Sequence, residues 1–251
     1  MQELDTKHGP WLQPPVPVLG PVIVAVTARK GGVGKTTLSY ELAAAWGAVL
    51  VDFDWDDGGA TIMWGARPSE AVMAALDGGP PPRIRSAPGR PDLVPCHPDL
   101  AGSGWHPERI ADALERWSAA WGRPIVVDSH PGIGELAFGA MQAAHLVGVP
   151  AVLRERELDA LAGMLRAHPQ DRIVILPNMA PAVPGGRQLR RLEELAAGRP
   201  VAPPVSAYPW LGRRARRSAL VLTPAAQRTE AAVRELTAMA TSVRAALPNA
   251  A

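Results

Sequence analysis

Cysteine, lysine and long apolar runs are all scarce in this chain of 251 residues. The single cysteine, Cys96, excludes an internal disulfide framework and any metal or cluster site built from several cysteines of one chain. No window approaches the length of apolar sequence that spans a membrane, and residues 1–20 lack the apolar core of a secretory signal. We therefore expect a cytoplasmic protein.

Lysine is so rare that its position is informative. Of the 26 basic residues three are lysines, and two of these, Lys30 and Lys35, stand in one glycine-rich stretch. The formal net charge is +2 and hydrophobic residues make up 47% of the chain, which is typical of a folded globular protein rather than a disordered one. The length suits one large α/β domain with an ample core.

Short aliphatic runs alternate with longer helical patterns along the chain. The runs are residues 22–27, 48–53, 92–96, 124–129, 145–150 and 172–178, and the helical patterns are 35–46, 107–121, 156–167, 187–197 and about 225–247. The runs are continuously apolar, as in parallel strands that are buried on both faces. This order predicts an α/β fold with a doubly wound, mostly parallel sheet and helices on both faces. We expect a Pro-rich arm over 1–20, a single domain over 21–251 and a surface loop over 76–91.

The stretch "ARKGGVGKTT", residues 28–37, follows the first predicted strand and opens the first predicted helix. Glycines let a backbone wrap closely around phosphate, so that successive N–H groups and the helix N-terminus face the anion. Lys35 is then positioned to reach the β- and γ-phosphates, and the Thr36 hydroxyl to ligate Mg²⁺. The context of strand, loop and helix predicts a nucleotide-binding P-loop.

Three carboxylates end the neighbouring predicted strands. Asp52 and Asp54 close "VLVDFD", and Asp128 closes "PIVVD". Such side chains project into the crevice where α/β folds bind ligands. Asp128 suits Mg²⁺, which prefers oxygen ligands, and Asp54 is positioned to orient a water for attack on the γ-phosphate. The alternative is that these carboxylates only cap turns.

Taken together, "KGGVGKTT", "DFD" and "IVVDSHPG" resemble the deviant Walker A, Walker A′ and Walker B motifs of the ParA/MinD ATPases, and "DLVPCHPDL" is similar to a segment these proteins carry between A′ and B. The resemblance implies that Lys30 crosses a nucleotide-sandwiched dimer interface and contacts the partner's ATP. It implies that Lys35 acts within the chain and that Thr36, Asp52 and Asp128 serve the metal. The implied nucleotide contacts are Lys30, Gly31, Gly32, Val33, Gly34, Lys35, Thr36, Thr37, Asn178 and Pro209, and the implied catalytic residues are Lys30, Lys35 and Asp54.

The sequence departs from the family pattern in three places. Relatives often carry Asn-Gln before the first lysine, where this chain has Ala28-Arg29, and Asp-Pro-Gln at A′, where Trp55 and Asp56 follow Asp54. His130 stands where relatives commonly have the first of two prolines after Walker B. For Asn178, which is implied to meet the adenine together with Pro209, a plain strand-end cap is the alternative.

A run of arginines distinguishes the C-terminal part. The stretch "LGRRARRSA" holds Arg213, Arg214, Arg216 and Arg217, which suit sequence-independent contact with DNA phosphates. The alternative is a solvated surface in which arginines pair with nearby carboxylates. The final helical pattern lacks Phe and Trp, so it favours a helix packed on the sheet or on a partner over a MinD-like membrane anchor.

The resemblance implies a small ParA-type partition ATPase. It would bind ATP and Mg²⁺, dimerise, associate with nucleoid DNA without sequence preference, and release DNA when a ParB-like partner stimulates hydrolysis. The alternatives are a MinD-like membrane-associated positioning ATPase and a ParA-like ATPase that positions another cargo.

Overall fold

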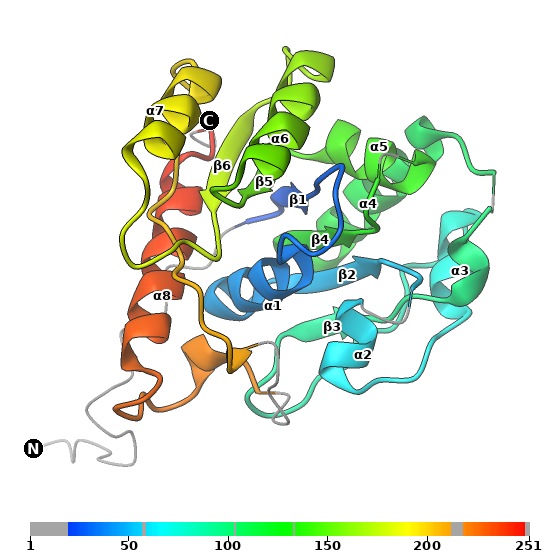
Figure 1. Cartoon of the computed structure of the whole chain (residues 1–251). Coiled ribbons are helices and arrows are strands. Elements are labelled where there is room, and N and C mark those ends of the chain that lie inside the picture. Colours follow the sequence, from blue (N-terminus) through cyan, green and yellow to red (C-terminus); the bar gives the residue numbers. More distant parts are fainter. Residues whose placement is uncertain (1–19, 57–58, 103, 133, 212–217, 249–251) are drawn as a thin grey trace, which may run out of the picture.

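The computed structural model describes residues 20–56, 59–102, 104–132, 134–211 and 218–248, which form a parallel sheet covered by helices (Figure 1). The strands are β1 (Ile23–Val26), β2 (Val49–Phe53), β3 (Asp92–Val94), β4 (Ile125–Ser129), β5 (Leu146–Ala151) and β6 (Ile173–Pro177). Their order is β3-β2-β4-β1-β5-β6, and every neighbouring pair is parallel. The predicted fold class and all six predicted strands are confirmed.

The structure contains a helix at each of the long helical patterns that the sequence predicted. They are α1 (Lys35–Trp46), α2 (Ala60–Trp64), α3 (Ala71–Leu76), α4 (Pro107–Trp121), α5 (Glu135–Ala143), α6 (Glu155–Ala167), α7 (Gly186–Ala196) and α8 (Glu230–Ala245), with 3₁₀ turns η1 (Pro98–Leu100) and η3 (Leu220–Leu222). The prediction missed α2, α3 and α5, which are short. It also began α8 too early, because Thr229 and Ala226 form a hydrogen-bonded turn in front of the helix.

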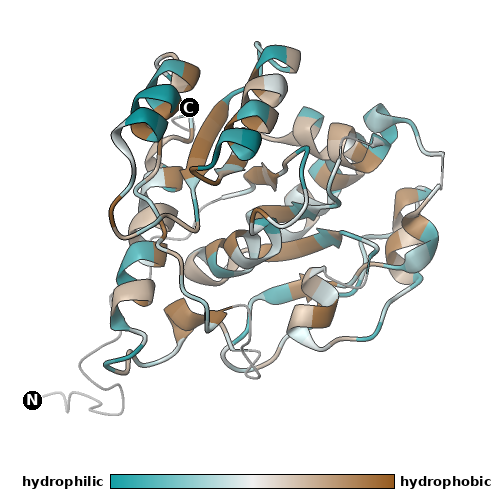
Figure 2. Cartoon of the chain, in the orientation of Figure 1, coloured by the Kyte–Doolittle hydropathy of each residue, from teal (hydrophilic) through white to brown (hydrophobic). Residues whose placement is uncertain are grey.

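Alternate residues of each strand enter two opposite apolar layers. Val24 and Val26 of β1 pack in the layer that contains α1 and α8, whereas Ile23 and Ala25 pack with α4 and α5 on the other face. In Figure 2 hydrophobic colouring follows the strands and the helix sides turned toward them. Both faces of the sheet are therefore buried, which explains why the strands read as continuous apolar runs.

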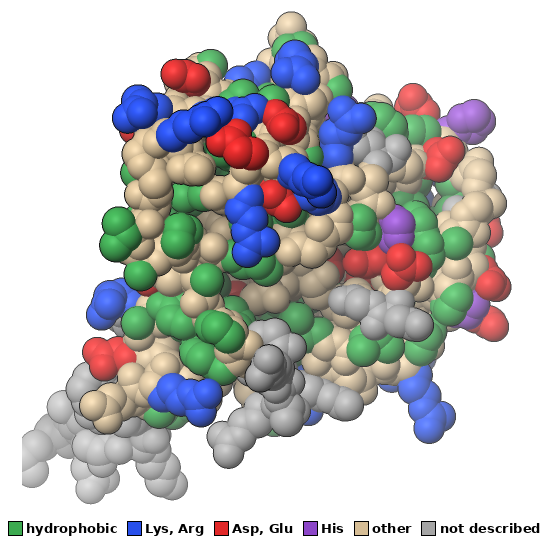
Figure 3. All heavy atoms as spheres, in the orientation of Figure 1, with side chains coloured by type: hydrophobic (Ala, Val, Ile, Leu, Met, Phe, Trp, Pro, Cys, Tyr) green, Lys and Arg blue, Asp and Glu red, His purple; other side chains and the backbone are tan. Residues whose placement is uncertain are grey.

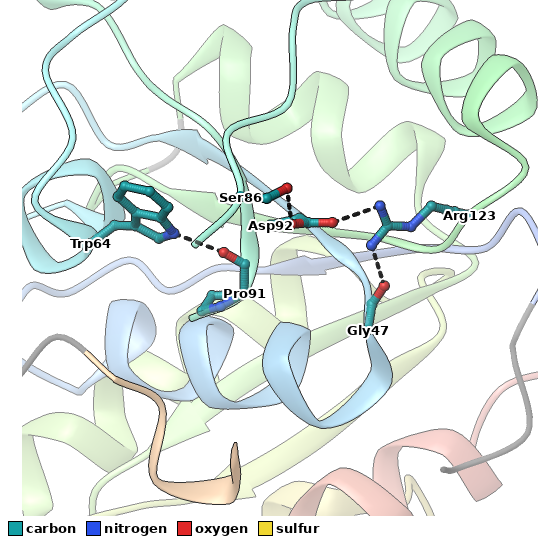
Figure 4. A network of polar contacts seen from close by, with 6 residues as sticks. All are labelled: Gly47, Trp64, Ser86, Pro91, Asp92 and Arg123. Atoms are coloured by element: carbon teal, nitrogen blue, oxygen red, sulfur yellow. Dashed lines mark hydrogen bonds and ion pairs between the residues drawn. The ribbon is translucent and has the colours of Figure 1, made fainter. Parts of the chain in front are cut away.

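A polar network fastens the β3 edge of the sheet to the end of α1 (Figure 4). Arg123 donates to Asp92 Oδ2 at 2.7 Å and to the carbonyl oxygen of Gly47, just beyond α1, also at 2.7 Å. In the same region the Trp64 indole donates to the Pro91 carbonyl at 2.7 Å. Residues 80–91 lie outside helices and strands apart from a bridge at Arg85, so the predicted surface loop over 76–91 is confirmed except at its first residues.

Helix α8 packs on α1, in the apolar layer on one face of the sheet. Its residues Leu236, Met239 and Val243 are fully buried or nearly so, and the Trp46 indole of α1 donates to the Ala240 carbonyl at 3.2 Å. The sequence predicted a helix packed on the sheet or on a partner, and the structure places the apolar face of this helix against α1. Within the described part of the chain, no helix combines the length and apolarity needed to cross a membrane.

Candidate nucleotide-binding site

The glycine-rich loop has the backbone that only glycine adopts readily. Gly32 and Gly34 have φ of 74° and 90°, in the left-handed region. A Cβ on Gly34 would lie 2.1 Å from Nδ2 of Asn178, which donates to the Val33 carbonyl at 2.8 Å. The loop is thus tied to the end of β6 through a contact that leaves no room for a side chain at Gly34.

Lys35 begins α1 and is 4% exposed at the bottom of this loop. Burial lowers the pKa of its ammonium group, while the nearby carboxylates of Asp128 and Asp54 oppose that shift. The register of the sheet sets Asp128 beside Val26 of β1 and beside Asp52 of β2. The three predicted carboxylates therefore gather with Lys35 at the carboxyl edge of the sheet.

Asp128 is fully buried, and its two oxygens differ. Oδ1 accepts from the Ser39 hydroxyl at 3.2 Å, whereas Oδ2 has no hydrogen-bond partner among the described residues. Burial, reinforced by the charge of Asp52, raises its pKa well above the usual range, and a hydrogen bond from the Thr36 side chain partly opposes this. A cation beside Asp128 and Thr36 would satisfy the open oxygen.

Asp54 follows the end of β2 and is 5% exposed. Its Oδ1 is a second buried carboxylate oxygen without a hydrogen-bond partner in the part of the chain that is described. Burial raises the pKa of Asp54, and the charges of His130 and Lys35 oppose the shift. Asp54 thus keeps an acceptor available close to Lys35.

Asp52, predicted to support the metal, has both oxygens engaged by backbone. Oδ1 accepts from Asp54 N at 3.0 Å and Oδ2 from Thr61 N at 2.6 Å, at the start of α2. Burial raises its pKa to about 6, against the effect of these hydrogen bonds. A Cβ on Gly59 would lie 2.5 Å from the Asp54 carbonyl oxygen, so the loop closes tightly around this carboxylate. Asp52 shapes the loop that carries Asp54, a role that the sequence pattern did not distinguish from metal support.

The Lys30 side chain contacts α6. Its Nζ lies 2.8 Å from Oε1 of Glu157, and its side chain is 41% exposed. The hydrogen bond from Lys30 lowers the pKa of Glu157. The two lysines of the loop therefore occupy different environments, one buried among carboxylates and the other at the surface.

The two residues implied to contact the adenine, Asn178 and Pro209, lie in different environments. Asn178 is buried and donates to the Val33 carbonyl of the loop, while Pro209 is exposed in the segment after α7. No sequence signal pointed to the contact between Asn178 and Val33, because it joins residues 145 positions apart.

The predicted DNA-binding arginines 213, 214, 216 and 217 lie outside the described residues. Upstream, basic and acidic side chains are interleaved over α6 and α7 (Figure 3). Arg191 of α7 pairs with Glu155 and Asp159 of α6, and Arg187 lies 3.6 Å from Glu155. Arg187 and Arg191 of α7 therefore have carboxylate partners on α6.

A left-handed glycine loop between a parallel strand and a helix, with a buried lysine and carboxylates at the adjoining strand ends, defines a P-loop nucleotide-binding protein. Hydroxyl and carboxylate oxygens at Thr36 and Asp128 fit Mg²⁺, the hard cation that accompanies nucleotides. No family model matches the chain.

Comparison with curated proteins confirms the resemblance predicted from the motifs. The chain is 31% identical over 162 residues to the chromosome-partitioning ATPase Soj of Thermus thermophilus, covering 62% of this chain and 65% of Soj. It is 29% identical over 158 residues to the chromosome partitioning protein ParA of Myxococcus xanthus, covering 56% of this chain and 55% of that protein. The chain thus spans less than two thirds of the length of these relatives.

Solved structures confirm the fold. An ATP complex of Cyanothece McdA superposes with a TM-score of 0.72 at 16% identity, over 90% of this chain and 95% of McdA. MinD of Aquifex aeolicus gives 0.69 at 18% identity, over 89% and 97%. A cobyrinic acid a,c-diamide synthase from Mycobacterium smegmatis, with bound ADP and magnesium, gives 0.60 at 24% identity, over 78% and 91%. The architecture is that of the ParA/MinD type of P-loop protein.

Proposed function

We propose that this chain is a ParA-type ATPase whose ATP-bound dimer binds DNA without sequence preference. One observation carries the proposal: a single loop holds two lysines in different environments. Lys35 is buried beside Asp54 and Asp128, and Lys30 reaches the surface beside Glu157. The first arrangement supports binding of a nucleotide phosphate within the chain, and the second supports a lysine that acts on another subunit.

The residues around Lys35 have separate roles in phosphoryl transfer. The loop N–H groups and Lys35 bind the phosphates, and Thr36 and Asp128 hold Mg²⁺, which when bound neutralises phosphate charge. Asp54 uses its open Oδ1 to orient the attacking water. Asp52 fixes the backbone on which Asp54 sits through the hydrogen bond from Asp54 N.

Lys30 supplies the dimer contact. In the single chain it pairs with Glu157, whose side chain is 17% exposed. A surface ion pair of this kind contributes about 0–1 kcal/mol, so a phosphate of bound ATP in a facing subunit competes with it readily. ATP-dependent dimerisation then exchanges a weak contact within the chain for a charge-assisted contact between chains.

DNA is favoured over a membrane as the surface to which the dimer binds. The apolar residues of α8 are buried against α1, so this helix offers no apolar face for insertion into lipid. The run 213–217 places four arginines within five residues of the C-terminal part, and we propose that this positive charge contacts DNA. In this proposal the dimer associates with the nucleoid and is released when a ParB-like partner stimulates hydrolysis; the likeness to a chromosome-partitioning ATPase and a chromosome partitioning protein supports a role in partition.

The test compares Lys30→Ala with Arg29→Ala, which removes a positive charge from the adjacent, exposed position of the same loop. We expect Lys30→Ala to abolish the ATP-dependent mass increase in light scattering while ATP still binds, and Arg29→Ala to dimerise. Normal dimerisation of Lys30→Ala would refute the role of Lys30.

Co-sedimentation with non-specific DNA and, in parallel, with anionic liposomes separates the candidate functions. We expect ATP-dependent, salt-sensitive retention on DNA that is lost when the four arginines of the run are replaced by alanine. Retention on liposomes alone would favour the MinD-like alternative, and retention on neither surface would favour another cargo.

A further inference from the structure

Asp54, Asp56 and His130 meet where the loop after β2 faces the end of β4. One potential ligand atom from each residue lies within 4.8 Å of the other two. His130 Nε2 and Asp56 Oδ2 are already 2.9 Å apart. Among the described residues, this is the one group of three or more carboxylate, imidazole or thiol side chains so arranged.

Two further observations point to a ligand at this group. The Asp54 side chain is more than nine-tenths buried, and its Oδ1 has no hydrogen-bond partner among the described residues. The His130 ring stacks on Trp55, with ring centres 4.0 Å apart and planes 8° from parallel, which restrains the plane of the imidazole. A stacked imidazole near a carboxylate that has an unsatisfied oxygen is an arrangement that a metal ion can complete.

We propose that Asp54, Asp56 and His130 bind a divalent transition-type cation, with Zn²⁺ as the best fit. Imidazole with two carboxylates is a ligand set for such ions, whereas the hydroxyl and carboxylate oxygens of Thr36 and Asp128 suit Mg²⁺. The two sites are therefore distinguished by their ligand chemistry.

Metal binding requires the three ligand atoms to move closer together. In a tetrahedral zinc site with bonds of about 2.0–2.1 Å, ligand atoms lie roughly 3.3 Å apart. The separation of up to 4.8 Å therefore contracts when the ion binds. Asp56 is 67% exposed and the His130 side chain 25% exposed, so Asp56 is free to move and the ion has a path of entry.

A bound ion would engage the Asp54 carboxylate. If Asp54 orients the attacking water, as the proposed function holds, occupancy slows ATP hydrolysis without preventing ATP binding. The metal site itself does not depend on that function, and it is tested without nucleotide.

The experiment titrates the metal-free full chain with Zn²⁺ by calorimetry and with Co²⁺ by visible absorption, in the absence of nucleotide and Mg²⁺. The variants are His130→Gln and Asp56→Asn. The matched control is His168→Gln, since His168 also pairs with an aspartate, Asp171 at 3.2 Å, but belongs to no three-residue group in the described chain. Circular dichroism verifies that each variant is folded.

We expect one Zn²⁺ per chain, a visible Co²⁺ band, and a loss of affinity of about tenfold or more in His130→Gln and Asp56→Asn but not in His168→Gln. Equal affinity in His130→Gln and His168→Gln would overturn the proposal and leave His130 and Asp56 as a structural ion pair. Absence of a saturable site in the unmodified chain would overturn it as well. Because no nucleotide is present, neither result depends on whether the chain hydrolyses ATP.

Discussion

Replacing Glu41 tests how α1 holds the segment that follows the arginine run. Glu41 lies in the middle of α1 and is 1% exposed. Its Oε1 accepts from Leu220 N at 3.0 Å and its Oε2 from Val221 N at 3.1 Å, at the start of η3. The buried carboxylate therefore satisfies two backbone donors that the 3₁₀ turn leaves unpaired.

Glu41→Gln keeps the shape but leaves one acceptor oxygen for these two N–H groups. One charge-assisted hydrogen bond is lost, worth about 1.5–3 kcal/mol, and an amide NH₂ then faces a backbone donor. Relief of the buried charge offsets part of this loss. We expect a decrease in the free energy of unfolding of about 2 kcal/mol, which for a chain of this size lowers Tm by about 4–8 °C.

Thermal denaturation measures the stability, and hydrogen exchange at the amides of Leu220 and Val221 locates the change. The matched control is Glu115→Gln, the same substitution at an exposed position of α4. We expect faster exchange at both amides in Glu41→Gln only. If Glu41→Gln unfolds within a degree of the control and exchange is unchanged, the two hydrogen bonds do not stabilise this segment and the reasoning fails.

Three other substitutions test single contacts. Gly59→Ala places a methyl group against the Asp54 carbonyl, so we expect a loss of about 1–3 kcal/mol of stability and slower ATP turnover, measured by denaturation and phosphate release, with ATP binding retained. Gly34→Ala combines a strained φ with a collision with Asn178, so nucleotide binding measured by calorimetry should fall at least tenfold; binding within twofold of the parent would contradict the loop geometry. Arg123→Lys keeps the charge but cannot donate to both Asp92 and the Gly47 carbonyl, as Arg123 does in Figure 4. It should lower the free energy of unfolding by about 1–2 kcal/mol. An unchanged midpoint of urea denaturation would show that the second hydrogen bond does not contribute to stability.

The sequence predicted most where the signal is local. The P-loop follows from a glycine pattern between a strand and a helix, and α1 and α4 begin and end at the predicted residues. Short helices such as α2 were missed, because five residues carry too little periodicity to separate them from the loop around them.

The local sequence pattern could not predict contacts between residues that are far apart in the chain. Asp52 looks like Asp54 in the sequence, but its oxygens are used by the backbone of its own loop. Arg191 of α7 has two carboxylate partners, Glu155 and Asp159, which only the packing of α6 supplies. Local composition cannot reveal a partner that lies on another element.

The stretch "ARKGGVGKTT" illustrates both kinds of information. The sequence by itself determined that it forms a phosphate-binding loop with two lysines, because glycine freedom and the following helix are local properties. Only the tertiary structure decided that Lys35 is buried beside Asp54 and Asp128 while Lys30 pairs with Glu157. The reason is physical: the parallel register brings strand ends together from distant parts of the chain, and the packing of α6 beside the loop supplies the charge that Lys30 meets.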